Sequence, residues 1–360
     1  METEQMGGKM LGYGSAFTVI FTPCIQCKNK RYNRENKQVS KIFYGPQSYS
    51  DCKKEFLINE YIRKNLNNFH KYVFLWDKMC KPPLYKTILK YDYDIKKCIN
   101  HDNINDKIFD RRSIMLIGNN AGSEMLSLWG KDLAKKTSLL DMINKHLVYI
   151  YHILLSVSEL KDINVSHNDI HSRNIMIKNN KAKLIDFGLS GYLSNNSFVK
   201  ERSNDLLSEN RYFVPIPPDI LFYKISSFKQ IKYCSDLDGF EEFKNTHTKV
   251  LFKRNFDHQI KTLFNTLKTK LSKITTDLSI SYRKLDIYSI GMLFAHLIYV
   301  YYRHKNKSID NFKKVVKQNQ YIKEFIELFN NMTHLVVKDR YTVNQALKTY
   351  EELLRKNNLL

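Results

Sequence analysis

The stretch SHNDIHSRNIMIKNNKAKLIDFGLS, residues 166–190, constrains the fold of this chain more than any other segment. Asp169 and Asn174 precede two short apolar runs, and Asp186 follows them directly. An Asn-Asn pair separates the runs, and such a pair is typical of a tight turn between antiparallel strands. A β-hairpin of this length brings Asp186 back beside Asn174. The sequence therefore predicts one site that holds two acids and an amide.

These three side chains suit a site for a metal ion and a hydroxyl group. The carboxylate of Asp169 can orient a hydroxyl or accept its proton. Asn174 and Asp186 offer oxygen atoms to a hard cation such as Mg²⁺, which binds one or two protein oxygens together with substrate phosphates. The competing interpretation is a turn-rich helix exit with ordinary polar residues. The agreement of motif and context favours the metal site.

Composition limits the classes of protein that the chain can belong to. Of its 360 residues 43% are hydrophobic, which suffices for one large domain or two closely packed domains. The formal net charge is +22, which is compatible with attraction to nucleic acid, acidic protein or an anionic membrane. No dense basic block or RNA-binding signature accompanies this charge, so we interpret it as a solvated lysine surface.

Cysteines and the longest apolar run bear on the compartment. Six cysteines are scattered along the chain, which is few for a disulfide scaffold. Cys24 and Cys27 form a C-x-x-C pair, but no second pair follows at zinc-finger spacing, and we expect free thiols. No signal-peptide pattern opens the chain. Residues 287–302 contain His296 and are short for a membrane span, so they predict a buried helix in a soluble, intracellular protein.

The pattern of apolar residues changes along the chain. Strands are expected in the first part, at residues 10–21, 39–44, 72–76 and 113–117, with one helix at residues 50–66. Helices are expected later, at residues 139–160, 282–302, 321–331 and 342–355. Turn residues around Gly122 separate the two parts. The sequence therefore predicts a small β-rich lobe, a hinge near residues 117–123 and a larger helical lobe.

Two further features of the β-rich part suggest a ligand. Gly12 and Gly14 interrupt a strand pattern, which indicates either a plain hairpin turn or a backbone that closely approaches a phosphate. Lys41 lies inside an apolar strand and must therefore find an anion or reach solvent. Glu55 and Glu60 on the following helix are the candidates. Glu55 fits better, because it adjoins the apolar face of that helix.

Taken in order, these motifs resemble the signature set of eukaryotic-type protein kinases. The matched residues are Gly12, Gly14 and Val19 of the glycine-rich loop, the strand lysine Lys41 with Val39, His167, Asp169 and Asn174 of the catalytic loop, and Asp186, Phe187 and Gly188 of D-F-G. Further matches are Pro217, Pro218 and Asp219 in place of A-P-E, Asp286 at the head of a central helix, and Arg340 in place of a late arginine. The abundance of Lys and Asn and the form H-N-D-I-H also resemble the divergent kinases of large DNA viruses.

The resemblance implies an α+β, bilobal protein-kinase-like fold. Its small β-rich N-lobe would span residues 1–118 and its larger helical C-lobe residues 119–360, with residues 223–280 as an insertion before the central helix. It implies ATP and Mg²⁺ as cofactors and transfer of the γ-phosphoryl group to Ser or Thr hydroxyls of a protein. The expected partner is a protein substrate, for which acidic proteins suit the charge. The expected state is a monomer, in host cytoplasm or in a virion.

The resemblance also gives each matched residue a role. Lys41, positioned by Glu55, would hold the α- and β-phosphates, Asn174 and Asp186 would hold Mg²⁺, and Asp169 would orient and deprotonate the acceptor. The nucleotide would contact Gly12 and Gly14 through its phosphates, Val19, Val39 and Met176 through its adenine faces, and the segment Leu116–Asn120 through adenine hydrogen bonds.

Several positions depart from the family pattern. Phe17 replaces the third glycine of the loop, and Asn168 replaces the arginine that in the family meets an activation-loop phosphate. His171 replaces the lysine of Ser/Thr kinases, and Arg173 stands where tyrosine kinases have arginine. We expect Arg173 to neutralise the negative charge on the transferred phosphoryl group, because its guanidinium is charged at any pH. His171 would assist or pack.

Three other functions stay open. The form H-x-D-x-H-x-x-N also resembles small-molecule kinases of the aminoglycoside and choline type, although these generally lack the D-F-G and the Pro-Pro-Asp closure. A nucleotide-binding pseudokinase scaffold is disfavoured by the complete set of Lys41, Asp169, Asn174 and Asp186. An adaptor for nucleic acid or membranes is compatible with the basic surface, but no motif indicates it.

Overall fold

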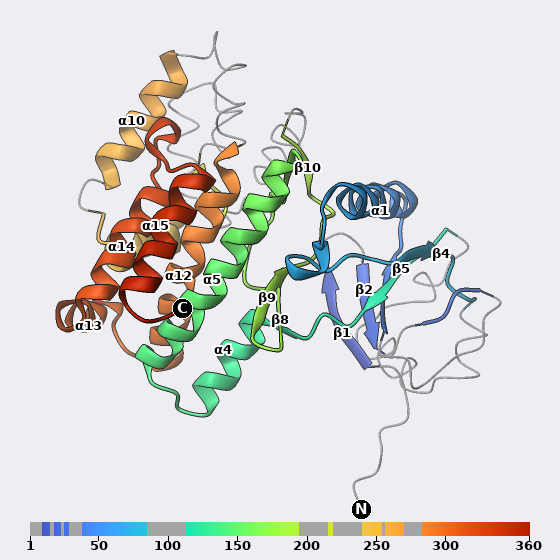
Figure 1. Cartoon of the computed structure of the whole chain (residues 1–360), viewed down its shortest axis with the longest axis horizontal. Helices are drawn as coiled ribbons and strands as arrows, with labels where there is room; N and C mark the ends of the chain where they lie inside the picture. Colours follow the sequence, from blue (N-terminus) through green and yellow to red (C-terminus); the bar gives the residue numbers. More distant parts are fainter. Residues whose placement is uncertain are drawn as a thin grey trace, which may run out of the picture. The chain divides into compact units, whose positions relative to one another are not determined.

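The computed structural model describes residues 9–14, 18–22, 25–28, 38–84, 112–193, 215–218, 240–253, 256–269 and 283–360. The chain divides into two compact units (Figure 1). The sheet unit comprises Met1–His70, Phe74–Gly122 and Asp186–Gly188, and the helical unit comprises Lys71–Val73, Ser123–Ile185 and Leu189–Leu360. A small β-sheet part and a helical part are the two components of a bilobal α+β kinase fold.

The described strands of the sheet unit form a five-stranded antiparallel sheet. Its strands are β1 (Lys9–Gly14), β2 (Thr18–Thr22), β3 (Gln38–Phe43), β4 (Lys78–Cys80) and β5 (Ile114–Asn119), in the order β1-β2-β3-β5-β4. Helix α1 (Ser48–Asn65) packs on this sheet and buries Cys52 with Phe43, Ile114 and Leu116. Because β3 lies between β2 and β5, all its residues from Val39 to Phe43 are buried.

Two strand predictions were wrong in detail. Residues 10–21 were predicted as one strand, but they form the two strands of the β1–β2 hairpin. Residues 72–76 form no strand and make only an isolated bridge, from Val73 to Leu184. Their apolar character has another cause, because Val73 and Leu75 are buried in the core. A short helical turn, η1 (Phe69–Lys71), precedes them.

The expectation of free thiols was wrong for Cys27. Cys27 and Cys80 form a disulfide that links the segment after β2 to β4, with their Cα atoms 5.8 Å apart. The backbone of Lys28 also bonds to Lys81, through an N–H···O distance of 2.9 Å. Cys52 is a buried free thiol. The other three cysteines lie outside the described residues.

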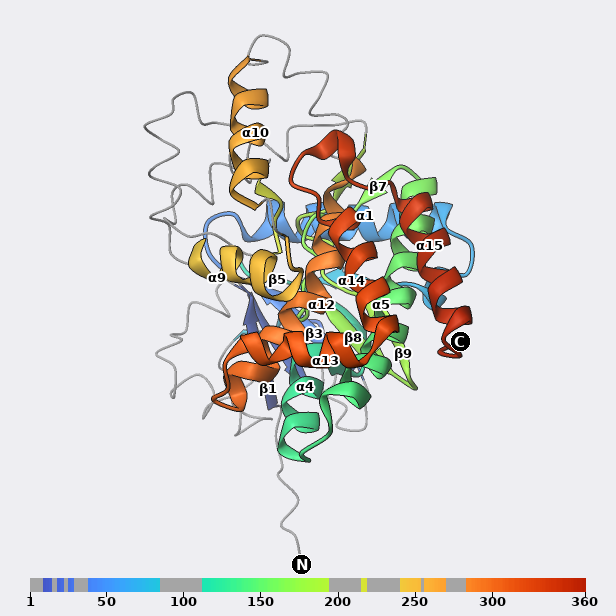
Figure 2. The ribbon, with the colours of Figure 1, turned by 90° about the vertical axis from the view of Figure 1, so that its left-hand side faces the viewer.

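The helical unit is built around two long helices. Its main helices are α4 (Met125–Ala134), α5 (Leu139–Asp162), α12 (Leu285–His304), α13 (Phe312–Gln318), α14 (Gln320–Met332) and α15 (Val343–Lys356), with the turns η5 (Ile309–Asn311) and η6 (Val337–Asp339). Helices α12 and α15 pack against α5, and α14 packs against both α12 and α15 (Figure 2). A capping box of Thr342 and Gln345 fixes the start of α15.

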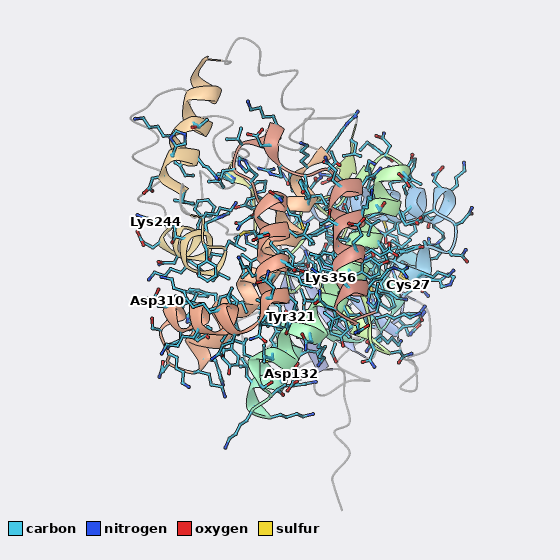
Figure 3. All side chains as sticks on the ribbon, turned by 60° about the vertical axis from the view of Figure 1, so that its left-hand side comes forward. Cys27, Asp132, Lys244, Asp310, Tyr321 and Lys356 are labelled. Carbon is cyan, nitrogen blue, oxygen red and sulfur yellow. A yellow bond between two sulfur atoms is a disulfide. The ribbon has the colours of Figure 1, made fainter. Side chains whose placement is uncertain are left out.

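Polar contacts tie the outer helices together. The hydroxyl of Tyr321 on α14 donates to Asn144 Oδ1 on α5 over 2.9 Å. Lys356 at the end of α15 pairs with Glu324 on α14, with Nζ and Oε1 2.7 Å apart. Figure 3 labels Tyr321 and Lys356 on this face of the unit.

Helix α12 is the buried helix that the sequence predicts. Among the described residues it is the one helix long and apolar enough to cross a membrane by length and composition, and 78% of that stretch is buried inside the protein. Its neighbours are α5 and α14. Burial of this kind is expected of the core helix of a globular unit.

Part of the predicted insertion belongs to the core of the helical unit. The described residues form α9 (Phe240–Asn245), the π-helical turn η4 (Thr246–Val250) and α10 (Phe256–Thr269). His247 is fully buried, and its Nε2 lies 2.9 Å from the Tyr288 hydroxyl on α12. Lys253 is also buried and donates to the Thr333 carbonyl over 2.6 Å. Residues 240–253 therefore pack in the core of the helical unit.

Candidate active site

Lys41 on β3 is the centre of a buried charge cluster in the sheet unit. Its Nζ donates to Glu55 Oε2 over 2.8 Å and to Asp186 Oδ1 over 2.9 Å. The side chain of Lys41 is 5% exposed, and that of Glu55 is fully buried on α1. Glu60 instead pairs with Arg63 on the exposed face of the same helix. Of the two acids that the sequence offered to Lys41, the structure pairs it with Glu55.

Two residues that the sequence analysis missed hold Glu55 in place. Trp76 Nε1 donates to Glu55 Oε1 over 2.6 Å, so both carboxylate oxygens have donors. Asn59, one turn after Glu55, accepts from the Trp76 backbone N–H over 2.8 Å and donates to the Glu55 carbonyl over 2.6 Å. A signal was present, because an asparagine on the buried face of a helix requires a polar partner.

The surroundings of Lys41 favour its charged form. Burial by itself lowers the pKa of Lys41, but the carboxylates of Asp186 and Glu55 outweigh burial and raise the pKa above its ordinary value. Burial raises the pKa of Glu55, and the Lys41 ammonium opposes that change. Lys41 is therefore a cation at neutral pH.

The D-F-G turn is confined by close contacts. Asp186 has a φ of 63°, in the left-handed region, and its Oδ1 accepts from the Gly188 backbone N–H over 3.4 Å. A Cβ atom at Gly188 would lie 3.3 Å from Asp186 Oδ1 and 3.4 Å from Glu55 Oε2. Phe187 between them is fully buried. A larger residue at position 188 would press on the two acids that hold Lys41.

In the helical unit, Asp286 at the start of α12 fixes the backbone of the catalytic loop. Its Oδ2 accepts from the His167 N–H over 2.8 Å and from the Ser166 hydroxyl over 2.9 Å. Its Oδ1 accepts from the Asn168 N–H over 2.8 Å. Asn168 adopts a φ of 65°, which asparagine tolerates better than most residues. Two short strands, β7 (Val165–Ser166) and β10 (Gly191–Tyr192), pair beside this loop.

Asn168 does not take over the phosphate-binding task of the arginine that it replaces. Its side chain is buried and donates to the Leu189 carbonyl over 3.2 Å. Its Oδ1 accepts from the Ser166 hydroxyl over 2.6 Å. The residue thus links the catalytic loop to the segment after D-F-G.

Asp169 is held by its neighbours in the loop. Asn174 Nδ2 donates to Asp169 Oδ2 over 2.9 Å and to its carbonyl over 3.0 Å. His167 Nδ1 accepts from the Asp169 N–H at 3.3 Å, while its Nε2 donates to the Ile185 carbonyl over 2.9 Å. His171 Nε2 lies 3.5 Å from Asp169 Oδ2. The side chain of Asp169 is 17% exposed, which leaves it accessible to a substrate.

Arg173 points to another partner. Its side chain is 71% exposed, and its Nε lies 4.0 Å from Glu124 Oε1. Glu124 belongs to β6 (Ser123–Glu124), which pairs with β8 (Ile175–Lys178). His171, whose side chain is 17% exposed, is therefore the basic residue that the described contacts place beside Asp169.

The predicted hairpin is present. Strands β8 and β9 (Lys181–Leu184) pair antiparallel, and Asn179 and Asn180 between them have φ values of 51° and 56°. Two consecutive positive φ values define the type I′ turn that matches the twist of a hairpin. The Ile185 N–H donates to the Asn174 carbonyl over 3.1 Å, which places the residue before Asp186 beside Asn174.

The residues predicted to bind Mg²⁺ have suitable oxygen atoms. Asn174 donates through Nδ2, so its carboxamide oxygen would be the atom that binds the ion. Asp186 keeps Oδ2 for a cation, because its Oδ1 accepts from Lys41 and Gly188. The described residues contain no cluster of three His, Cys, Asp or Glu that would bind a metal by itself. The pairing of Asn174 with Asp186 around Mg²⁺ stays a prediction.

The predicted nucleotide contacts are distributed over both units. Gly12 and Gly14 lie at the end of β1, and residues 15–17 lie outside the described part. Val39 and Leu116 are buried, and Leu116 pairs with Lys41 across the sheet. On β2 the partner of Lys41 is Ile20, whereas Val19 pairs with Ile42. Cross-strand partners share a face of a sheet, so Ile20 is a further candidate for the adenine contact.

Other predicted positions stay untested. Met176 lies on β8 and pairs with Glu124 and Lys183. Arg340 is buried, donates from Nε to the His334 carbonyl over 2.9 Å, and lies 5.0 Å from the centre of the Tyr288 ring. Its predicted partner, Asp219, lies outside the described residues.

Comparison with known proteins supports the assignment from geometry. The family model described as the protein kinase domain matches residues 95–223, a range that contains the catalytic loop, the β8–β9 hairpin and D-F-G. No curated protein matches the chain. The match agrees with the two residue groups around Lys41 and Asp169, and residues 95–223 are similar to a protein kinase domain.

Proposed function

We propose that this protein kinase transfers the γ-phosphoryl group of ATP to Ser or Thr hydroxyls of a protein substrate. The observation that supports it most is the contact of Lys41 with both Glu55 and Asp186. Burial removes the ammonium group and the carboxylates from water, and their mutual hydrogen bonds offset part of that cost. Kinases use such a lysine for nucleotide phosphates, and the family in general uses ATP with Mg²⁺.

The proposed reaction assigns one task to each side chain. The acceptor oxygen attacks the γ-phosphorus, and the bond from that phosphorus to the bridging oxygen breaks. The electron pair of that bond leaves with ADP, and the hydroxyl proton passes to the Asp169 carboxylate. Lys41 binds the α- and β-phosphates, while Asn174 and Asp186 would hold Mg²⁺. Bound Mg²⁺ neutralises charge on the phosphates.

The choice of Ser or Thr over Tyr draws on the catalytic loop. Arg173 occupies the position typical of tyrosine kinases, but its side chain is 71% exposed and lies beside Glu124. His171 instead occupies the Ser/Thr position, and its Nε2 lies 3.5 Å from Asp169 Oδ2. This arrangement supports a Ser or Thr acceptor.

The rival activity is phosphorylation of a small molecule, which the form H-x-D-x-H-x-x-N favours. A scaffold that binds ATP without turnover is the second rival.

We also propose a viral origin, because the composition is rich in Lys and Asn, and a monomeric state. The protein would act in host cytoplasm or in a virion. The Cys27–Cys80 disulfide favours the virion, because disulfides persist in oxidising environments and are rare in the cytosol.

Phosphoamino-acid analysis tests the proposed acceptor. The protein is incubated with γ-labelled ATP, Mg²⁺ and a mixture of acidic and basic protein substrates, and the labelled protein is hydrolysed. We expect phosphoserine or phosphothreonine, and we expect both to vanish with Asp169→Asn. Phosphotyrosine would contradict the acceptor. Absence of labelled protein with intact ATP binding would favour the small-molecule or scaffold rivals.

A further inference from the structure

Trp76 bonds to one face of helix α1 through three of its polar groups. Its indole Nε1–H donates to Glu55 Oε1 over 2.6 Å, and its backbone N–H donates to Asn59 Oδ1 over 2.8 Å. Its carbonyl oxygen accepts from Arg63 Nη2 over 2.8 Å. Because residues 55, 59 and 63 are four positions apart, they lie one above the other on the same face of the helix. A single residue outside the helix therefore bonds to three successive turns of it.

The segment that carries Trp76 is itself bonded to the sheet. The backbone N–H of Asp77 donates to the Ile117 carbonyl on β5 over 2.8 Å, directly before β4 pairs with the same strand. Helix α1 packs against β3, β4 and β5 (Figure 1). All of these contacts lie inside the sheet unit. The position of Glu55 relative to Lys41 on β3 is therefore set within that unit.

Gly118 on β5 leaves room for the indole ring. A Cβ atom at this position would lie 3.0 Å from Trp76 Cε3 and 3.3 Å from the Leu75 carbonyl oxygen. The ring also packs against the buried cluster that contains Phe43 of β3 and Cys52 of α1. Contacts with the sheet and with the helix thus confine the ring and fix the direction of its N–H.

The indole N–H holds the Glu55 carboxylate in one orientation. Glu55 is fully buried, and its Oε2 accepts from Lys41 Nζ over 2.8 Å while its Oε1 accepts from Trp76. Without the indole N–H, Oε1 would be a buried acceptor with no described donor, and the carboxylate could turn about its Cγ–Cδ bond. Lys41 would then lose one of the two acids that direct its ammonium group, the other being Asp186.

We propose that Trp76 is a positioning residue for phosphoryl transfer, which keeps Glu55 turned toward Lys41 and thereby aims the Lys41 ammonium at the nucleotide phosphates. This inference rests on the proposed function, because it takes the phosphates of ATP as the ligand of Lys41. Trp76 acts through Glu55 and takes no part in the chemical step itself. Asn59 and Arg63 assist by holding the helix against the Trp76 backbone.

Trp76→Phe tests the role of the indole N–H, because it keeps an aromatic ring and removes the donor. We expect kcat/KM for ATP to fall roughly 10-fold, because a misaimed Lys41 stabilises the transition state less well. Trp129→Phe is the matched control: Trp129 is the other tryptophan of the chain, and its Nε1 has no hydrogen-bond partner among the described residues. We expect this control to stay within about twofold of the wild type. A kcat/KM of Trp76→Phe within the same range would overturn the proposal.

A double-mutant cycle with Glu55→Gln separates positioning from general destabilisation. If Trp76 acts through Glu55, the loss caused by Trp76→Phe should shrink to within about twofold once Glu55→Gln has removed the carboxylate. Initial rates with γ-labelled ATP detect the low activity of these variants, and thermal unfolding reports their folding. A roughly 10-fold loss in both backgrounds would show that Trp76 acts independently of Glu55, and the proposal would be wrong.

A third readout does not depend on activity. The chain has two tryptophans, so in ¹⁵N-labelled protein the Trp76 indole signal is the one that remains in Trp129→Phe. A hydrogen bond of 2.6 Å to a carboxylate should shift this N–H proton signal downfield and protect it from exchange with solvent. We expect both effects to shrink in Glu55→Gln.

The indole signal also separates this inference from the proposed function. The same signal position and exchange rate in wild-type and Glu55→Gln protein would overturn the contact of Trp76 with Glu55, and the inference with it. If the signal responds to Glu55→Gln but wild-type protein transfers no phosphate to any protein, the proposed function fails. The positioning role in transfer then fails too, while the contact stands.

Discussion

At the scale of single residues, burial decides which side chains keep their charge. Lys41 is buried yet charged, because Glu55 and Asp186 both lie within hydrogen-bond distance. His146 on α5 is buried among aromatic rings and stays neutral. Its Nδ1 donates to the Met142 carbonyl over 2.6 Å, and its ring meets the Trp129 ring edge-on at a centroid distance of 5.6 Å.

His146 should make the stability of the fold depend on pH. Burial lowers the pKa of His146 to about 4, with Lys145 and Asp132 as the charged neighbours. Between pH 6.5 and about 4 the unfolded chain therefore binds more protons at this residue than the folded chain. The contribution of His146 to stability is complete above pH 6.5 and declines as the pH falls through this range, by on the order of 3 kcal/mol.

Urea unfolding at several pH values between 7 and 4 measures this contribution, with His146→Gln as the comparison. We expect the free energy of unfolding to fall more steeply with acid in the wild type than in the variant. Burial lowers the pKa of His296 to about 4 as well, with His171 and Arg173 as charged neighbours. Because His296 is present in both proteins, its contribution cancels in the comparison. Equal slopes in the two proteins would show that His146 is not held neutral.

At the scale of elements, the sequence predicted those whose burial follows a regular period. The helix expected at residues 139–160 is α5, Leu139–Asp162, and its stripe of buried residues continues over six turns. The strand expected at residues 39–44 is β3, Gln38–Phe43. The β8–β9 hairpin was predicted because its turn chemistry is local, with two asparagines in the left-handed region.

Elements that depend on distant partners could not be predicted in this way. Residues 72–76 are apolar because they pack in the core, and Trp76 also binds Glu55, so their pattern imitates a strand. The apolar residues of 240–253 follow no clear helical period, although Phe243, Val250 and Leu251 are buried there. Polar contacts such as that of His247 with Tyr288 also hold this segment in the core. The same limit applies to the site: the sequence suggested Glu55 for Lys41, but Trp76 had no visible link to it.

The Cys27–Cys80 disulfide is the element-level feature that the sequence analysis excluded. It joins residues 53 positions apart, and closing a loop of that length restricts the unfolded chain. We expect reduction, or Cys27→Ser, to lower the stability of the sheet unit by roughly 2–4 kcal/mol. Urea unfolding followed by fluorescence in a Trp129→Phe background, where Trp76 is the remaining tryptophan, measures the change with and without reductant.

Peptide mapping supplies the control for that experiment. Under non-reducing conditions, a peptide that joins Cys27 to Cys80 should be found, and the buried Cys52 should react with a thiol reagent only after unfolding. Reductant should have no effect on the unfolding of Cys27→Ser. An unchanged unfolding midpoint in reduced wild-type protein would contradict a stabilising role of the bond.

At the scale of the whole molecule, the residues of the proposed reaction belong to both units. The sheet unit supplies Lys41, Glu55 and Asp186, and the helical unit supplies Asp169 and Asn174. Within the sheet unit Trp76 bonds to Glu55, and within the helical unit Asp286 bonds to the backbone of the loop that precedes Asp169. The central claim is that these two groups serve one reaction, phosphoryl transfer from ATP.

Transfer of label from γ-labelled ATP to protein, in the presence of Mg²⁺, tests that claim most directly. Wild-type protein is compared with Lys41→Met and Asp169→Asn, with thermal unfolding as the control for folding. We predict transfer by the wild type and a loss of roughly 100-fold or more in each variant, because each lacks a group that the transition state requires. Transfer by both folded variants at the wild-type rate would contradict the account.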